Sequence, residues 1–455
     1  MNKAKADLLD HFQSPRLGFD EDEGGARGHA PPELIADERY QRLRRRLKEV
    51  GFFEPAPGQY AVRAALSLAC TLGSYAVLLW ANPSWPARVA CFFLAGFGLV
   101  QGTFIAHEAK HGSVSRRLWL AEATGQIFNS FLVGFSFSYF GRGHDLHHLH
   151  CNEADVDPDT LSTLFSVFPS EAAKKRGLGR LISRFQGFFI PALYPTWTLA
   201  MKWDGLTYVA RNLSKTRADQ LAMALHLLFW LGLPSLWLPF STVFVNYLGW
   251  SFFAGLYLAI AIPPNHVGRP VVNDGRAVDF LSQQIVTTRN LPSSPLIDYL
   301  MMNVNNHIEH HLFPWAPGGR LRRGRAIVRA FCVEEGLPYH ERPFFAGLAD
   351  VMAHLARMAK FTGKPAPAPD GSAIEGMPQL GRPAAGKTGT TNESKDAWFV
   401  GFTPDLLAGV WVGFDADRSL GSLTGGRAAT PIWTSFLQKA LAGRPVREFT
   451  KPENV

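Results

Sequence analysis

Eight of the fifteen histidines in this chain fall in three short clusters, HEAKH, HDLHH and HIEHH. Residues three or four positions apart share one face of a helix, so each cluster directs its imidazoles to one side. Such spacing is typical of metal ligands. The clustered residues are His107 and His111, then His144, His147 and His148, and finally His307, His310 and His311.

Eight imidazoles are more ligands than a single ion needs. Imidazole binds zinc, copper and iron, and a tetrahedral zinc takes only four ligands. The clusters therefore predict two metal ions. A redox-active pair held by neutral nitrogen donors can use O2 to remove hydrogen from an unactivated carbon chain, so a lipid is the expected substrate. The four cysteines include no CxxC pair, which argues against a thiolate zinc site and a disulfide framework.

The composition indicates a membrane protein. Of the 455 residues, 47% are hydrophobic and 12% aromatic, and the net charge is +8. The basic residues form short runs beside apolar segments, a pattern that favours the cytoplasmic face of a membrane over a nucleic-acid surface. We expect no nucleic-acid partner.

Four apolar segments define the expected architecture. Each has roughly 18 to 22 residues, enough for a helix to cross a hydrocarbon core about 30 Å thick. They form two closely linked pairs, so each pair predicts a hairpin that enters and leaves on the same side. All three clusters should then emerge on one face, the cytoplasmic one. The segments are residues 64–81, 87–106, 220–240 and 243–263.

Two further apolar stretches, residues 121–140 and 187–203, contain polar, Gly, Pro and Trp residues. We expect them to form helices at the membrane interface. His226 stands alone in the third apolar segment. It is predicted to be neutral and packed against a neighbouring helix, although an ionisable group inside a membrane also invites a functional interpretation.

The clusters, their placement around two hairpins and the run NHIEHHLFP at 306–314 resemble the membrane fatty-acid desaturase family, over about residues 50–345. The second cluster continues as HCNEADVDPD at 150–159, similar to a run in many bacterial and front-end desaturases. The resemblance implies a non-haem centre of two Fe ions, with O2 as co-substrate and an acyl-lipid or acyl-CoA substrate. Its ligands would be the eight clustered histidines and His266, with Asn265 as a ligand through water.

There are two departures from the family pattern. The third cluster begins with His307, where front-end desaturases commonly have glutamine, and the chain contains no HPGG motif of a fused cytochrome b5 domain. A separate electron donor, a ferredoxin or a cytochrome b5, is therefore expected. The protein itself is expected in a bacterial inner membrane. A histidine-box hydroxylase or carotenoid ketolase would share the metal chemistry, but the spacing of the clusters favours the desaturase.

Several carboxylates lie close to the clusters. Asp155, Asp157 and Asp159 could orient ligand imidazoles through their second ring nitrogen. Equally, Asp157 and Pro158 could begin a helix, with proline at its first position. Glu108 and Glu309 lie inside the clusters, where each could contact a metal ion or a ligand histidine. His150 could be an exposed helix residue or an outer contact of the site.

The composition changes after about residue 361. A Pro/Gly/Ala linker at 363–371 precedes KTGTTNESKDAWFVGF at 387–402 and AGVWVGFD at 408–415, which predict β-strands, and a helix is expected over 431–442. This tail resembles the carboxy-terminal end of the transpeptidase domain of class A penicillin-binding proteins. There, Lys387 and Thr388 would line a substrate carboxylate site. The chain contains no S-x-x-K and no S-x-N, so the nucleophile for acyl transfer is missing and a cell-wall function is disfavoured.

Together these features predict a mainly α integral membrane protein with two transmembrane helical hairpins, a cytoplasmic histidine-box cap and a small α+β fragment at its C-terminal end. The expected parts are a cytoplasmic segment at 1–55, a desaturase domain at 56–345, a helix and linker at 346–385, and a transpeptidase-like fragment at 386–455. Residues 33–50 of the first part should form a charged helix, solvated or at the membrane surface.

Overall fold

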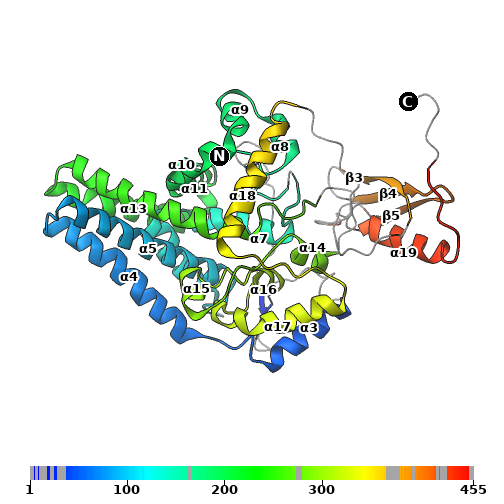
Figure 1. Cartoon of the computed structure of the whole chain (residues 1–455). Helices are drawn as coiled ribbons and strands as arrows, with labels where there is room; N and C mark the ends of the chain where they lie inside the picture. Colours follow the sequence, from blue (N-terminus) through cyan, green and yellow to red (C-terminus); the bar gives the residue numbers. More distant parts are fainter. Residues whose placement is uncertain are drawn as a thin grey trace.

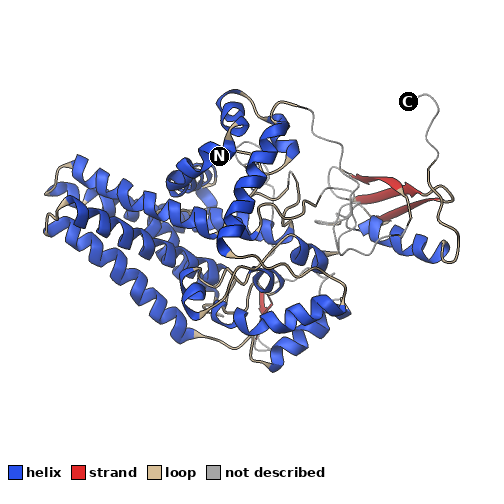
Figure 2. Ribbon diagram, viewed as in Figure 1, coloured by secondary structure: helices blue, strands red, loops and turns tan. Residues whose placement is uncertain are grey.

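The chain is mainly helical, with a small sheet near its C-terminal end (Figure 2). This confirms the predicted fold class. The computed structural model describes residues 37–115, 117–154, 156–161, 165–272, 279–364, 382–391, 395–416 and 428–449, together with residues 5, 9, 18–20, 25–27, 380 and 420. Near the start of the chain, β1 (Gly18–Asp20) pairs with β2 (Gly25–Arg27) in an antiparallel ribbon.

Three long apolar helices lie side by side (Figure 1). They are α4 (Pro57–Trp80), α5 (Trp85–Lys110) and α13 (Phe240–Ala261), and each is long and apolar enough to cross a membrane. Helices α4 and α5 form the first predicted hairpin. Small residues allow them to approach closely, since the Ser67 hydroxyl donates to the Gly98 carbonyl at 2.6 Å.

The second hairpin differs from the prediction, because its outgoing arm is not one continuous helix. Residues 220–240 are divided among α12 (Arg217–Leu227), the π-helical turn η4 (Leu228–Gly232) and the 3-10 turn η5 (Pro234–Leu236). Pro234 lacks the backbone N–H that would continue the helix. The arm still runs beside the first hairpin, since the Tyr75 hydroxyl donates to the Phe229 carbonyl at 2.7 Å. The described chain thus has three helices of membrane-crossing length, where four were expected.

The expected interfacial stretches are also broken into short helices. The first consists of α6 (Leu118–Gly125), the π-helical η1 (Gln126–Val133) and the start of α7 (Phe137–Leu149). The second consists of α10 (Gln186–Leu193), η2 (Tyr194–Thr196) and most of α11 (Trp197–Arg211). Large apolar side chains of the second point outward, with Phe188 80% and Trp203 61% exposed. Their place at a membrane interface stays a prediction.

The remaining helices of the region before residue 362 are shorter than the three long ones. They are α3 (Glu38–Glu49), α8 (Pro169–Lys174), α9 (Gly177–Arg184), η3 (Leu213–Lys215), η6 (Pro263–Asn265), α14 (Phe280–Val286), α15 (Pro295–Leu300), α16 (His307–Leu312), α17 (Gly318–Glu334), α18 (Phe344–Met358) and η7 (Ala359–Phe361).

The charged helix predicted near the start of the chain forms as α3, but it is not solvated all round. Tyr40, Leu43 and Leu47 are buried on one face, which packs against α17. The Tyr40 ring stacks on Phe313 at 4.9 Å between centroids. Since Phe313 directly follows α16, α3 supports the helix that carries the third histidine cluster.

The C-terminal tail forms the predicted strands and helix. Strands β3 (Ala385–Thr390), β4 (Asp396–Phe402) and β5 (Leu407–Gly413) make an antiparallel sheet in the order β3-β4-β5. Helix α19 (Thr430–Ala440) packs on it through Trp433, whose ring lies 5.0 Å from that of Phe399. Most of the predicted linker, residues 365–371, lies outside the described residues. The domain boundaries remain predictions.

His226 is packed against its neighbours, as expected. Its Nδ1 lies 2.7 Å from the Phe131 carbonyl and its Nε2 2.8 Å from the Tyr247 hydroxyl. A carbonyl only accepts, so Nδ1 carries the ring proton and Nε2 accepts from the tyrosine, the pattern of a neutral imidazole. Gly134, between η1 and α7, makes this packing possible. Its φ is +82°, and a Cβ there would lie 2.4 Å from His226 Nε2.

We expect Gly134→Ala to destabilise the protein by ~1–3 kcal/mol, because the added carbon combines an unfavourable positive φ with a clash against a fixed ring. Gly73→Ala on α4 is the matched control, since a Cβ there meets nothing within 4 Å. Thermal unfolding in detergent measures both. Equal midpoints for the two variants would contradict this account of Gly134.

Candidate metal centre

Nine histidines from four separate segments meet at one end of the long helices. His107 and His111 lie at the end of α5, and α7 carries the second cluster. His266 follows η6, directly after α13, and α16 carries the third cluster. Except for His144 and His266, which are partly buried, all of them are buried. The structure thus brings together every histidine predicted as a ligand.

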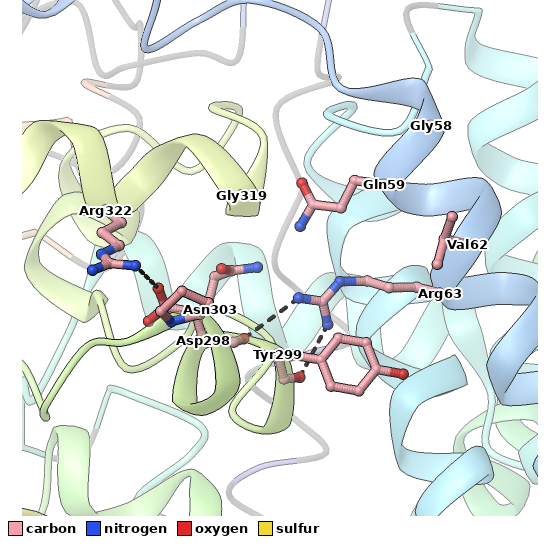
Figure 3. A pocket seen from close by; sticks show the side chains of 10 residues that line it. Gly58, Gln59, Val62, Arg63, Asp298, Tyr299, Asn303, Gly319 and Arg322 are labelled. Carbon is pink, nitrogen blue, oxygen red and sulfur yellow. Dashed lines mark hydrogen bonds and ion pairs between the residues drawn. The ribbon is translucent and has the colours of Figure 1, made fainter.

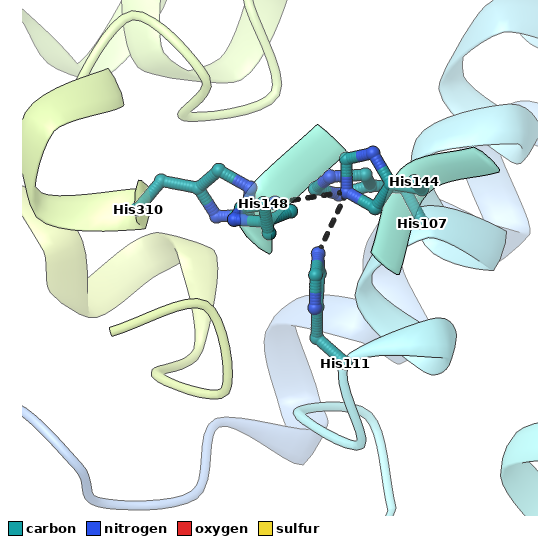
Figure 4. A group of neighbouring side chains, drawn as sticks. All are labelled: His107, His111, His144, His148 and His310. Carbon is teal, nitrogen blue, oxygen red and sulfur yellow. Dashed lines mark hydrogen bonds between the residues drawn. The ribbon is translucent and has the colours of Figure 1, made fainter. Parts of the chain in front are cut away.

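The nine rings form two neighbouring groups. In the first, each residue contributes one ring nitrogen to a set whose members all lie within 4.8 Å of one another. His144 Nε2 is central, at 2.8 Å from His111 Nε2 and 3.1 Å from His148 Nε2 (Figure 4). The first group comprises His107, His111, His144, His148 and His310.

The second group is centred on His266. Its Nε2 lies 3.2 Å from His147 Nε2 and 2.6 Å from His307 Nε2. His311 belongs to the same group, with one ring nitrogen within 4.8 Å of those of His147 and His266. The His311 ring stacks on His148 of the first group at 4.3 Å between centroids, so the two groups are adjacent.

Cys151 also lies beside the second group, although the sequence did not suggest it. Its Sγ is 3.4 Å from His266 Nδ1, the ring nitrogen that faces away from His147 and His307. Burial raises the pKa of the Cys151 thiol well above its usual value, and the Thr287 hydroxyl donates to the sulfur. The Cys151 Sγ also lies within 4.8 Å of one ring nitrogen each of His147, His266 and His311. Because it faces Nδ1, Cys151 contacts the His266 ring from the side opposite His147 and His307.

The chemistry of the donors fits two metal ions. Burial lowers the pKa of His144, His148, His310 and His311 well below the ordinary value, because the charged ring would lose its hydration and meet other imidazoles. Neutral rings keep a lone pair for a metal. The buried Nε2 atoms of His310 and His311 have no hydrogen-bond partner. Burying a ring nitrogen without a partner costs free energy of folding unless the nitrogen binds a ligand. Groups of imidazoles are suitable ligands for iron, zinc or copper.

Several rings are oriented through their other nitrogen. His147 Nδ1 donates to the Asp157 carboxylate, with both oxygens at 3.0 Å. His311 Nδ1 donates to Gln284 Oε1 at 2.8 Å, and His307 Nδ1 to the Val304 carbonyl at 2.9 Å. These contacts fix the tautomers and point the three Nε2 atoms toward the centre. The sequence suggested Asp157 but gave no signal for Gln284, a helix residue far from every cluster.

Asp157 begins a turn. The alternative prediction, that Asp157 and Pro158 begin a helix, is wrong. It is fully buried and accepts from the backbone N–H groups of Asn152 at 2.8 Å and Asp159 at 2.9 Å. Asp155, its predicted companion, lies outside the described residues. His150 is buried, contrary to its reading as an exposed residue, and its Nδ1 lies 2.8 Å from Glu153 Oε2.

Asn265 and Glu309, which were also predicted to lie around the metal ligands, have different surroundings. Asn265 is fully buried beside His266, and its Oδ1 has no hydrogen-bond partner. Glu309 accepts hydrogen bonds from Tyr339 at 2.7 Å and Asn290 at 2.8 Å. Asn290 in turn accepts from the Ile308 N–H, so Glu309 anchors α16 to its neighbours.

Glu108 lies beside the first group of rings. It accepts from the Tyr60 hydroxyl at 2.7 Å and from the Gly318 N–H at 2.8 Å, and its Oε1 is 3.8 Å from His107 Nδ1. Glu108 thus links the end of α5 to the beginnings of α4 and α17.

Comparison with known proteins gives two regions of similarity. Residues 83–343, more than half of the chain, match the family model described as fatty acid desaturase. The chain is 25% identical over 340 residues to an acyl-lipid (9-3)-desaturase of Physcomitrium patens, which covers 72% of this chain and 64% of that protein. It is 28% identical over 342 residues to a Delta(6)-fatty-acid desaturase of Caenorhabditis elegans, covering 71% and 75%.

The tail is similar to a different kind of protein. Over 82 residues the chain is 49% identical to penicillin-binding protein 1A of Neisseria lactamica, which covers 18% of this chain and 10% of that protein. This short C-terminal match confirms the resemblance predicted from the KTGT run, and it supports a fusion of two unrelated sequences.

We expect Asp157→Asn to weaken metal binding by ~10–100-fold, because the amide no longer provides a charged acceptor for His147 Nδ1. Asp159→Asn is the matched control, since its carboxylate is 52% exposed and 3.8 Å from the same nitrogen. Metal retained per chain during titration with a chelator measures the difference. Equal retention in the two variants would show that Asp157 does not support the site.

Proposed function

Because this chain belongs to the fatty acid desaturase family, we propose that it introduces a C=C bond into the acyl chain of a lipid, using O2. The observation that carries the proposal is the convergence of nine histidines in two adjacent groups at the end of membrane-length helices. No other cluster of this kind is found among the residues that the structure describes. The chain spans just under two thirds of the Physcomitrium patens relative, with 64% of that protein covered.

We assign the two groups to two iron ions. His107, His111, His144, His148 and His310 would hold one, and His147, His266, His307 and His311 the other. Bound iron would activate O2, which is the oxidant. The overall reaction takes two hydrogens from adjacent CH2 groups, and with O2, two electrons and two protons it yields the double bond and two water molecules. The histidines hold and tune the metal, and Asp157 and Gln284 keep their rings in place.

The two electrons must come from a separate donor, for which a ferredoxin or a cytochrome b5 is suitable. We place the histidine groups on the cytoplasmic side of a bacterial inner membrane, where either donor would reach them. The substrate is an acyl-lipid or an acyl-CoA. The name of the Physcomitrium patens relative, an acyl-lipid desaturase, supports an acyl-lipid as the substrate.

Expression of the full chain in a bacterial host with a matching donor should yield a new unsaturated fatty acid. His147→Ala and His310→Ala should each abolish it, since each removes a ligand of a different ion. His340→Ala is the matched control, because His340 is a partly exposed histidine outside both groups. Methyl esters of the cellular fatty acids, separated by gas chromatography and identified by mass spectrometry, report the product and the position of its double bond.

Wild-type levels of the product from both His147→Ala and His310→Ala would refute the assignment. A hydroxylated or ketolated product that depends on the same two histidines would instead identify a related oxidation at this centre.

We propose that the tail has no catalytic activity of its own. Lys387 lies on β3, at the edge of a three-stranded sheet, and its Nζ donates to the Thr388 carbonyl at 2.9 Å. The serine and lysine that would make and activate an acyl-transfer nucleophile are absent from the sequence.

A fluorescent penicillin should therefore not label the full chain, while the host's own penicillin-binding proteins label in the same membranes. A chain that ends at residue 364 should give the same fatty acid product at a comparable level per protein. Specific labelling lost in Lys387→Ala, or loss of product on truncation with the protein still folded, would assign the tail a role.

A further inference from the structure

A second polar site lies away from the histidine groups, where the first turns of α4 meet α15 and the start of α17. A cavity of about 510 Å³ opens there. Figure 3 shows Gln59, Val62 and Arg63 on α4 facing Tyr299, Asn303 and Arg322 across it. None of the nine histidines lines this cavity.

Arg63 is the central feature of the cavity. It is only 5% exposed, yet its guanidinium donates to uncharged acceptors, the Tyr299 carbonyl at 3.2 Å and Met302 Sδ at 2.9 Å among them. Within the described part of the chain no carboxylate forms an ion pair with it. Glu108 attracts it from behind the cavity, but that carboxylate accepts its hydrogen bonds from Tyr60, Ser113 and the Gly318 N–H. The guanidinium carbon also lies 4.8 Å from the centre of the Tyr299 ring. These uncharged partners do not neutralise the buried charge, whereas an anionic ligand would.

A second guanidinium reaches the cavity from the opposite side. Arg322 is half exposed, and its contact with Asp298 is loose, at 3.9 Å. The Asp298 carboxylate is already held by the Ser293 hydroxyl at 2.8 Å and by Asn305 Nδ2 at 2.7 Å. The cavity therefore presents two guanidinium groups and the amide of Gln59. Several N–H donors around one space suit an anion with several oxygens, such as a phosphate.

The surroundings of the cavity indicate which kind of molecule would carry the phosphate. Helix α4 is one of the membrane-length helices, and the cavity lies at its first turns. A helix of this length that crosses a hydrocarbon core of about 30 Å has its first turns near the lipid head groups. Val62 and Leu66 on α4 are 59% and 43% exposed, and Leu296 on α15 is 66% exposed. Exposed apolar side chains thus lie beside a cavity lined by cationic groups. A free phosphate would make no use of this apolar rim, whereas a phospholipid fits both parts.

We propose that this cavity binds the phosphate of a membrane phospholipid, with Arg63 and Arg322 holding the phosphate oxygens and the acyl chains lying along Val62, Leu66 and Leu296. The proposal goes beyond the desaturase reaction and does not depend on it, because binding at this site can be measured without turnover.

Isothermal titration calorimetry on the full chain in a neutral detergent tests the proposal with three probes. Dioctanoylphosphatidylglycerol should bind, and dioctanoylglycerol and inorganic phosphate should each bind about tenfold more weakly or worse, because one lacks the charge and the other the chains. Arg322→Gln should weaken binding of the phospholipid about tenfold. Arg323→Gln, an exposed neighbour on the same helix that does not line the cavity, should leave it unchanged.

Arg63→Gln should also weaken binding, and its thermal midpoint is measured because it alters a buried group. If that variant does not fold, the exposed Arg322→Gln decides the outcome. Wild-type affinity in Arg322→Gln would overturn the proposal. Diacylglycerol bound as tightly as the phospholipid would refute recognition of the phosphate, and inorganic phosphate bound as tightly would refute the lipid as its source.

Discussion

The arrangement of this molecule depends on keeping many imidazoles neutral, buried and directed at common points. A charged ring among its neighbours would be repelled and desolvated, which is why burial lowers the pKa of His144 and His310. Several of the ring nitrogens lie only 2.6 to 3.2 Å from one another, which leaves little room for protons between them. Such a set is stable only when other parts of the fold hold each ring and a ligand shares the lone pairs.

The fold provides that support at two levels. Long helices bring the clusters to one end, since α5 ends at the first cluster and α13 ends just before His266. Outer contacts then fix the individual rings, through Asp157 for His147 and Gln284 for His311. Helix α3 contributes from a distance, because Tyr40 packs on Phe313 at the end of the third cluster. The supporting residues thus come from segments far apart in the sequence.

Two basic features of the cap serve different ends. Some arginines make ion pairs within the protein, as Arg46 does with Glu334 at 2.7 Å. Arg63 and Arg322 face a cavity beside an apolar rim, although Arg322 also lies 3.9 Å from Asp298, and such a cavity suits a phospholipid. The C-terminal tail is unrelated to the desaturase region. It folds as a small sheet covered by one helix, but the sequence lacks the nucleophile of the domain that it resembles.

The sequence by itself determined the three histidine clusters, the apolar hairpin of α4 and α5, the family and the foreign tail, because each depends on local spacing or on a contiguous run. It overestimated the second hairpin, where Pro234 ends a helix that hydropathy alone would continue. Only the tertiary structure decided how the nine histidines divide into two groups, and that Gln284 and Cys151 stand behind the rings. It also decided that Arg63 lines a cavity. These relations join residues distant in sequence, and local pattern carries no information about which of them meet.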